Sequence, residues 1–148
     1  MAEGVLTWNG VWDDDPARVA SRRSIESVCR RAKDEWLALY AEDALIEDPV
    51  GPSPFDPQGH GHRGRDRMSA YWDGTIATTE KIDFVVDASY TAGAEVANVG
   101  SVIAYLPGGV HVQTFGVYIY RVNADGLIDS LRTYWDFDRA MGTVSAAP

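Results

Sequence analysis

Two adjacent acids, Glu47 and Asp48, end an apolar run and stand directly before Pro49. Neighbouring side chains of a strand point to opposite faces, so only one of these acids can face the protein interior. Pro49 favours an extended backbone at Asp48 and removes the next backbone donor. A carboxylate that lies beside apolar walls gains proton affinity, which is what a general base needs. The alternative is that both acids are solvated residues at the end of a strand.

The elements that precede and follow these acids are expected to be helical. Three aspartates before Pro16 complement the dipole of a helix start, and proline fits the first helical turn. Asp34 is expected to cap a second, shorter helix, and a short strand over residues 44–48 then ends at the acids. Residues 49–63 are rich in proline and glycine and predict a loop beside the candidate base. The first and third helices are expected at residues 15–32 and 64–79.

The second half of the chain has the pattern of a sheet. Strong turn signals, Pro107-Gly108-Gly109 and Asn123–Gly126, separate long alternating segments. Four long strands are expected at residues 81–91, 94–106, 110–122 and 127–138. Helices followed by sequential strands predict an α+β fold in which helices cover one face of an antiparallel sheet. One domain is expected over residues 15–140, between a leader (1–14) and a C-terminal tail (141–148).

The composition excludes several classes of partner. The 148 residues carry a formal net charge of -9, which argues against nucleic acid and against an anionic membrane surface, because both attract cationic side chains. Cys29 is the single cysteine, so it is expected to fill space in a helix and cannot form an intramolecular disulfide. The sequence has neither an apolar span of 18 residues nor a basic region followed by an apolar run at its start, which predicts a soluble cytoplasmic protein.

Strand alternation assigns the side chains of the last two long segments to faces. One face of residues 110–122 carries Val112, Thr114, Gly116, Tyr118 and Tyr120. Gly116 leaves room on that face for a ligand or a bulge. The opposite face is too apolar to leave in water and predicts a homodimer through Phe115, Val117 and Ile119. One face of the last segment carries Leu131, Thr133, Trp135 and Phe137.

Several of these segments together resemble a known family. They are the stretch Trp36–Asp48 (WLALYAEDALIED), the Pro49-Val50-Gly51 that follows it, Gly64-Arg65-Asp66 at a helix start, and Tyr134-Trp135. This set resembles the ketosteroid isomerase family, which belongs with SnoaL-like polyketide cyclases and limonene epoxide hydrolase to the nuclear transport factor 2 superfamily. The resemblance covers residues 16–138. It implies a curved antiparallel sheet wrapped around three helices, forming a cone with the ligand in its open end.

The resemblance also implies a mechanism. In the family, the aspartate of this segment is a general base that moves a proton between two carbons of a steroid through a dienolate, and the matching residue is Asp48. The family stabilises the enolate oxygen with a tyrosine on the first helix and a protonated aspartate on a late strand; the matching positions are Ser24 and Tyr118. Tyr118 is expected either to bind the oxyanion in place of the missing acid or only to shape the pocket. Ser24 is expected either to donate as well or to bond a carbonyl one turn earlier.

Four aromatic residues match pocket walls of the family and are expected to contact the substrate: Tyr40, Tyr71, Trp72 and Trp135. Ordinary aromatic core packing is the alternative for each of them. His60 and His62 lie in a glycine-rich loop without a firm third ligand, so no metal and no other cofactor is expected. The loop over residues 49–63 is longer than in short family members and could cover the mouth as a lid.

The sequence therefore predicts a steroid delta-isomerase-like enzyme that moves a proton next to a ketone on a small hydrophobic, steroid-like substrate. Two alternatives stay open. A non-catalytic binder of steroid-like molecules would fit the loss of both family donors. An epoxide-opening or cyclising enzyme would need a second carboxylate near Asp48, supplied by Glu80 or Asp136, although Asp136 could instead pair with Arg132.

Overall fold

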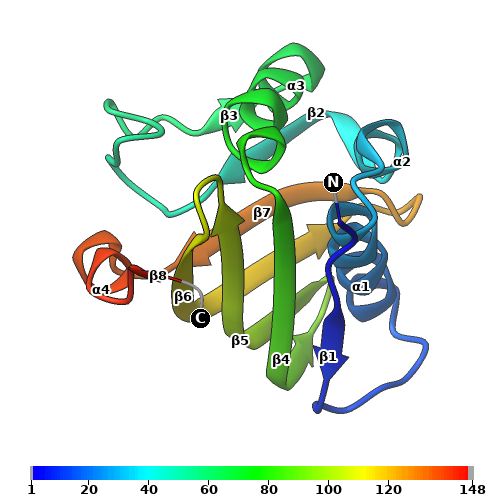
Figure 1. Cartoon of the computed structure of the whole chain (residues 1–148). Coiled ribbons are helices and arrows are strands. Elements are labelled where there is room, and N and C mark those ends of the chain that lie inside the picture. The colour runs from blue at the N-terminus through cyan, green and yellow to red at the C-terminus, as the bar shows by residue number, and fades with distance from the viewer. Residues whose placement is uncertain (1, 147–148) are drawn as a thin grey trace.

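The computed structural model describes residues 2–146, in which helices pack on one side of a curved sheet (Figure 1). The strands are β1 (Leu6–Trp8), β2 (Tyr40–Glu47), β3 (His62–Arg63), β4 (Lys81–Ala92), β5 (Glu95–Leu106), β6 (Val110–Val122), β7 (Ile128–Tyr134) and β8 (Ser145–Ala146). The helices are α1 (Pro16–Cys29), α2 (Lys33–Ala38), α3 (Arg65–Gly74), the short 3-10 helix η1 (Ile76–Thr78) and α4 (Phe137–Met141). This arrangement confirms the predicted α+β class.

The sheet has the strand order β1-β4-β5-β6-β7-β2-β3, with β8 added to β6. Short turns connect β4, β5, β6 and β7 one after another, and each of these strands is antiparallel to the next. The predicted antiparallel sheet is found in these four strands, whereas β1 pairs with β4 and β2 pairs with β7 in parallel. Both parallel pairs join segments that are far apart in the chain, so no hairpin imposes the antiparallel direction on them.

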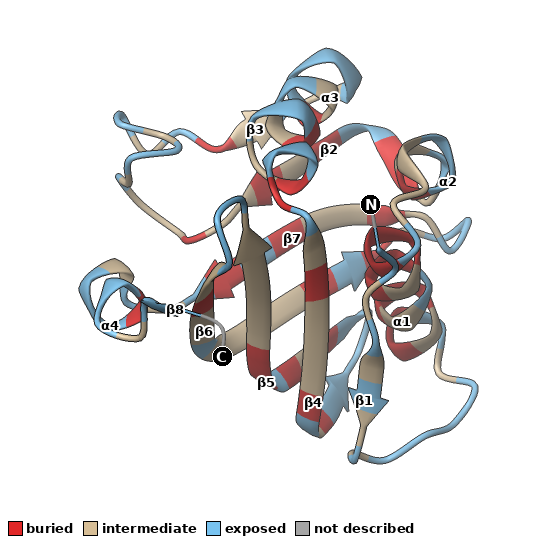
Figure 2. Cartoon of the chain, viewed as in Figure 1, coloured by how far each residue is buried: buried red, intermediate tan, exposed pale blue. Residues whose placement is uncertain are grey.

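The concave face of the sheet holds the core. Helix α1 packs across β4, β5, β6 and β7, and Figure 2 shows buried residues on α1 and along these strands. Register shifts interrupt three of the strand pairs, and such irregularities bend a sheet. Gly116 pairs with Gly100, and a Cβ at Gly116 would lie 2.2 Å from the backbone oxygen of Tyr134. The space at Gly116 is therefore filled by that backbone and is not left for a ligand.

Two helix starts differ in how well the sequence predicted them. Helix α1 begins at Pro16, and the side chain of Asp15 accepts hydrogen bonds from the backbone N–H groups of Ala17 and Arg18, as the acidic run predicted. The predicted cap at Asp34 is wrong. The cap position is Ala32, two residues earlier, and helix α2 begins at Lys33, so Asp34 lies in its first turn, where its charge still complements the helix dipole.

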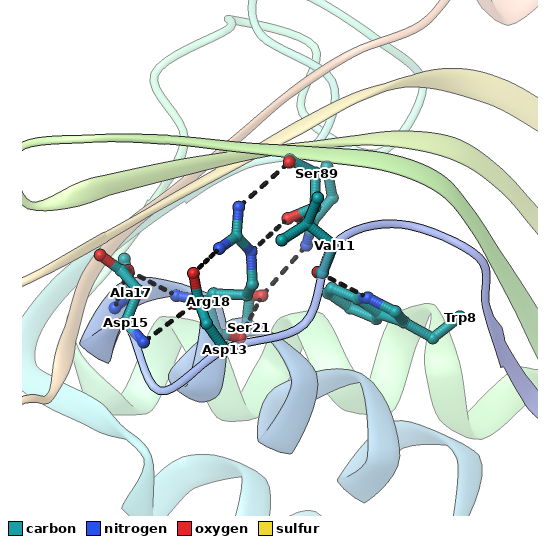
Figure 3. A network of polar contacts seen from close by, with 9 residues as sticks. Trp8, Val11, Asp13, Asp15, Ala17, Arg18, Ser21 and Ser89 are labelled. Carbon is teal, nitrogen blue, oxygen red and sulfur yellow. Dashed lines mark hydrogen bonds and ion pairs between the residues drawn. The ribbon is translucent and has the colours of Figure 1, made fainter.

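The segments predicted as a leader and a tail contribute to the sheet. Leu6 pairs with Phe84 of β4, and the following chain returns to α1, where Asp13 forms a 2.7 Å ion pair with the buried Arg18. Figure 3 shows Arg18 also donating to the hydroxyl and the carbonyl of Ser89, both at 3.0 Å. At the other end, β7 stops at Tyr134 instead of 138, because the chain turns into α4. Ser145 of β8 then pairs with β6.

Candidate active site

Glu47 and Asp48 lie in different environments, as strand alternation predicted. Glu47 accepts a 3.0 Å hydrogen bond from Arg132 on the outer face of the sheet. Asp48, the first residue after β2, lines a cavity of about 360 Å³ between the helices and the concave face. This volume lies within the range of about 300–1,000 Å³ that is typical of small-molecule sites.

The cavity is mostly apolar. Aliphatic and aromatic side chains from α1, α2 and the strands line it, among them Ile25, Val28, Trp36, Ile82, Phe84 and Val102. Asp48 is the one charged side chain among the lining residues of the described part of the chain. The other polar atoms on the cavity wall belong mainly to hydroxyl groups. Such a cavity fits a largely hydrophobic molecule with few polar atoms.

Three side chains hold the Asp48 carboxylate. Thr133 and the indole N–H of Trp135 donate to Oδ1 at 2.5 and 2.8 Å, and the hydroxyl of Tyr71 donates to Oδ2 at 2.5 Å. Hydrogen bonds to an ionised acceptor are about twice as strong as neutral ones. The carboxylate is therefore fixed in orientation from two sides, by the sheet at Oδ1 and by α3 at Oδ2.

The parallel pairing of β2 with β7 explains the contact with Thr133. Glu47 is opposite Arg132 in that register, and both side chains point outward. The next residues along each strand, Asp48 and Thr133, therefore both point inward. The sequence placed Thr133 on one face with Trp135, yet it did not identify Thr133 as a site residue. The missing signal was the strand pairing, which no local pattern reveals.

Tyr118 and Ser24 both line the cavity, with different hydrogen-bond partners. The hydroxyl of Tyr118 donates to the backbone oxygen of Thr114 at 3.1 Å. Burial, and then the charge of Asp48, raise the pKa of Tyr118. Ser24 shares a 2.9 Å hydrogen bond with the hydroxyl of Tyr40, so its partner is a cavity hydroxyl rather than a carbonyl of its own helix.

The other expected wall residues separate into two groups. Tyr40, Tyr71 and Trp135 line the cavity. Trp72 is not among the described residues that line the cavity. It is buried, and its ring centroid lies 5.1 Å from that of Trp36, so it packs in the core. Burial, and then the negative charge of Asp48, raise the pKa of Tyr71 well above its ordinary value. Tyr71 therefore stays a hydrogen-bond donor at neutral pH.

The long loop and the C-terminal helix meet at the cavity. Phe55 of the loop and Phe137 of α4 both line it, with ring centroids 6.3 Å apart. His62, at the end of this loop, packs its ring 4.9 Å from Tyr71. No group of three or more His, Cys, Asp or Glu residues that could hold a metal ion occurs within residues 2–146.

The acids considered as partners of Asp48 lie elsewhere. Glu80 is exposed, and neither it nor Asp136 is among the residues that line the cavity within the described chain. Asp136 approaches Arg139 at 3.9 Å, while Arg132 pairs with Glu47. Asp136 and Arg132 therefore pair with other residues and not with each other. The groups that contact the Asp48 carboxylate are hydroxyl and indole donors, and none of them is a second acid.

Comparison with known proteins identifies the family. Residues 21–131 match the SnoaL-like domain. The chain belongs to the SnoaL-like family. Comparison with curated proteins gives no match. In the described part of this SnoaL-like protein, no helix is both long and apolar enough to cross a membrane.

Solved structures similar to this SnoaL-like protein include mycobacterial relatives. RV0760c from Mycobacterium tuberculosis is 31% identical, with a TM-score of 0.81 over 91% of this chain and 98% of that one. A second structure of RV0760c, in complex with estradiol-17beta-hemisuccinate, is 32% identical with a TM-score of 0.80, covering 88% and 98% of the two chains. The Delta 5-3-ketosteroid isomerase from Mycobacterium sp. is 31% identical, also with a TM-score of 0.80 and the same coverage.

Proposed function

We propose that this protein is an isomerase that moves a proton next to a ketone on a steroid-like substrate, with Asp48 as the general base. One observation carries the proposal. Among the residues that the structure describes, Asp48 is the one charged side chain that lines the mostly apolar cavity, and three donors hold its carboxylate. A positioned carboxylate in an apolar site is suited to removing a proton from carbon beside a carbonyl.

In the proposed reaction, a single base moves one proton between two carbons of the same substrate molecule. Asp48 removes a proton from the carbon next to the ketone, which breaks one C–H bond and leaves a dienolate. The protonated Asp48 then returns this proton to a more distant carbon, so the double bond moves and no electron is gained or lost. Because Thr133 and Trp135 hold Oδ1, the carboxylate keeps its orientation during both transfers.

The relatives support the substrate class. One similar structure is a Delta 5-3-ketosteroid isomerase, and another is a complex with an estradiol derivative. Both relatives share about a third of their residues with this chain, across nearly their whole length. The apolar lining and the volume of the cavity fit such a ligand.

The test follows the conversion of a 5-ene-3-ketosteroid to its conjugated enone by ultraviolet absorbance. We expect Asp48→Asn to lower the rate at least about a hundredfold, because the amide cannot accept the proton. Glu47→Gln is the matched control: it neutralises the neighbouring acid, which points away from the cavity to Arg132, and should keep the rate within about twofold. Equal rates for wild type and Asp48→Asn would overturn the proposal.

A specific observation favours a second candidate, a non-catalytic binder. The residues at the positions of the family's two oxygen donors are Ser24 and Tyr118, and Tyr118 donates to a backbone carbonyl. The loss of one such donor commonly costs about a hundredfold or more in rate. A non-catalytic binder should associate tightly with a ketosteroid and should not convert it. Its affinity for the steroid should be the same in wild type and Asp48→Asn.

We also propose a homodimer through the outer face of the sheet. Val99, Val117 and Tyr134 are in register across β5, β6 and β7, and the neighbouring Phe115 is 55% exposed. A contiguous apolar row of this kind is typical of a protein interface. Sedimentation at micromolar concentration should give a dimer, and Val117→Lys should give a monomer. A wild-type monomer would exclude this assembly.

A further inference from the structure

The mouth of the cavity lies beside the loop that follows β2. Most of the described residues that line the cavity are buried or half-buried, but four are exposed and therefore lie at its opening: Phe55, Gly74, Thr78 and Met141. Phe55 belongs to the loop and Met141 to α4, and the loop and this helix lie on the same side of the molecule (Figure 1). A ligand that enters the cavity must therefore pass the loop and α4.

The tip of this loop bonds to itself. Ser53 and Asp56 exchange two backbone hydrogen bonds of 3.0 Å, and the carboxylate of Asp56 accepts from the backbone N–H of Gly61 at 2.7 Å. In the part of the chain that the structure describes, the hydrogen bonds of residues 51–60 all have both partners within residues 51–61. The tip can therefore move as one piece without breaking a hydrogen bond to the rest of the protein.

Glycines flank this tip at a narrow neck, and prolines stiffen it. Gly51 and Gly59 have φ angles of 88° and 72°, which favour glycine, and three of the seven residues between them are prolines with a fixed φ. A Cβ at Gly59 would lie 2.7 Å from the backbone nitrogen of Pro52, so the two arms of the loop touch. Just before the neck, the N–H of Val50 donates to the carbonyl of Thr133 at 2.9 Å. The rigid tip is thus hinged on a fixed base.

One aromatic contact joins the tip to α4. The ring centroids of Phe55 and Phe137 are 6.3 Å apart with an angle of 71° between the ring planes, which is the edge-to-face arrangement that aromatic rings prefer. Phe55 is 46% exposed. The segment after α4 is fixed to the sheet, because the N–H of Gln113 donates to the hydroxyl of Thr143 at 2.8 Å. The loop is therefore the moving partner of this contact, and α4 is the fixed one.

The same contact reaches the candidate base. The ring of Phe137 also lies 6.5 Å from that of Trp135, whose indole N–H donates to Oδ1 of Asp48 at 2.8 Å. A row of aromatic rings thus runs from Phe55 at the mouth to the side chain that holds the carboxylate. Closure over such a site excludes water from it.

We propose that residues 51–60 form a lid that opens to admit an apolar ligand and closes through the contact of Phe55 with Phe137. The lid turns on the glycine-flanked neck, and the exchange of ligand follows the fraction of time that the contact is broken. The steroid-like class of the ligand rests on the proposed function, whereas the gating of the cavity does not.

The first test measures access to the cavity without a steroid. Val102→Cys in a Cys29→Ala background places a thiol on the cavity wall, and an aromatic disulfide reagent labels it only while the lid is open. Phe55→Ala should speed the labelling roughly two- to tenfold, which is the effect of losing one aromatic pair. Tyr90→Ala removes an exposed aromatic side chain outside the described lining and is the matched control. Equal labelling rates for the two variants would exclude the lid.

A second test separates a lid from an ordinary wall contact. Stopped-flow fluorescence gives the association and dissociation rates of a 4-en-3-ketosteroid. A lid gates both directions, so Phe55→Ala should raise both rates by the same factor and keep Kd within about twofold. Faster dissociation alone, with a weaker Kd, would show that Phe55 only contacts the ligand, and the proposal would be wrong.

The lid and the proposed enzymatic function can fail separately. If Phe55→Ala speeds labelling but wild type does not convert the steroid, the lid stands and the isomerase role does not. If labelling is the same in Phe55→Ala and Tyr90→Ala while Asp48→Asn abolishes turnover, the isomerase role stands and the lid does not. Because Phe55 is half-exposed, its replacement by alanine should leave the fold intact, which thermal unfolding verifies.

Discussion

The hydroxyl of Tyr71 donates to Oδ2 of Asp48 at 2.5 Å, across the boundary between α3 and the end of β2. This bond ties the helix to the strand at the point where the candidate base stands. The ring of Tyr71 also packs against the rings of His62 and Trp36, with centroids 4.9 and 6.4 Å away. Ring packing therefore fixes the position of the phenol, and its hydroxyl donates to the carboxylate.

Removal of this hydroxyl should destabilise the protein through Asp48. Tyr71→Phe is expected to lower the free energy of unfolding by about 1.5–3 kcal/mol, because a hydrogen bond to an ionised group is lost. In an Asp48→Asn background the same change should cost about 1 kcal/mol or less, since the acceptor is no longer charged. Urea unfolding of the four proteins in this double-mutant cycle measures the coupling. Additive effects would mean that the bond contributes nothing.

Thr133 should act on turnover through the position of Asp48. Thr133→Val removes one of the two donors to Oδ1 while it keeps the side-chain shape, and we expect the rate of the proposed isomerisation to fall about tenfold. Thr133→Ser retains the hydroxyl and should restore most of the rate. If Thr133→Val and Thr133→Ser have the same rate, the hydroxyl has no positioning role.

The buried guanidinium of Arg18 should be important for stability. It is 3% exposed and bonds Asp13 and Ser89, while Ser89 in turn donates to Asn98 at 2.8 Å. Arg18→Met removes the donors to the hydroxyl and the carbonyl of the buried Ser89 and the ion pair with the exposed Asp13, and it is expected to cost about 1–3 kcal/mol.

The matched control for Arg18 is Arg23→Met, on the exposed side of the same helix, which should change the free energy of unfolding by less than about 0.5 kcal/mol. Thermal and urea unfolding measure both variants. A similar small effect at both positions would show that the network in Figure 3 does not hold the N-terminal strand in place.

Cys29 provides a prediction about pH. Burial, reinforced by the charge of Asp83, raises the pKa of the Cys29 thiol to about 11. The native protein therefore holds this proton more tightly than the unfolded chain. The contribution of the protonated Cys29 thiol to the free energy of unfolding is complete below about pH 9 and is lost as the pH rises toward 11.

The reactivity of Cys29 tests this assignment. Because only the thiolate reacts, a disulfide reagent at pH 8 should modify the native protein at least tenfold more slowly than it modifies the protein in concentrated urea. Cys29→Ala should give no reaction under either condition. Equal rates in buffer and in urea would show that the thiol is accessible in the native state.

Local patterns in the sequence determined much of this architecture. The aspartates before Pro16 predicted where α1 starts, because the cap and the first turn depend only on neighbouring residues. Alternation predicted that Tyr118 and Tyr120 share a face, and that Thr133 and Trp135 share another, because the side-chain direction in a strand repeats every two residues. The separation of Glu47 from Asp48 follows from the same rule.

The tertiary structure alone decided which of these side chains meet. The parallel register of β2 and β7 places Thr133 on Asp48, and the addition of β1 to β4 makes an edge strand of a segment expected to be a leader. Hydrogen-bond direction was equally invisible in the sequence: Tyr118 donates to its own strand, whereas Ser24 joins Tyr40. These contacts join residues far apart in the chain or depend on side-chain rotation, so they arise from packing and not from local periodicity.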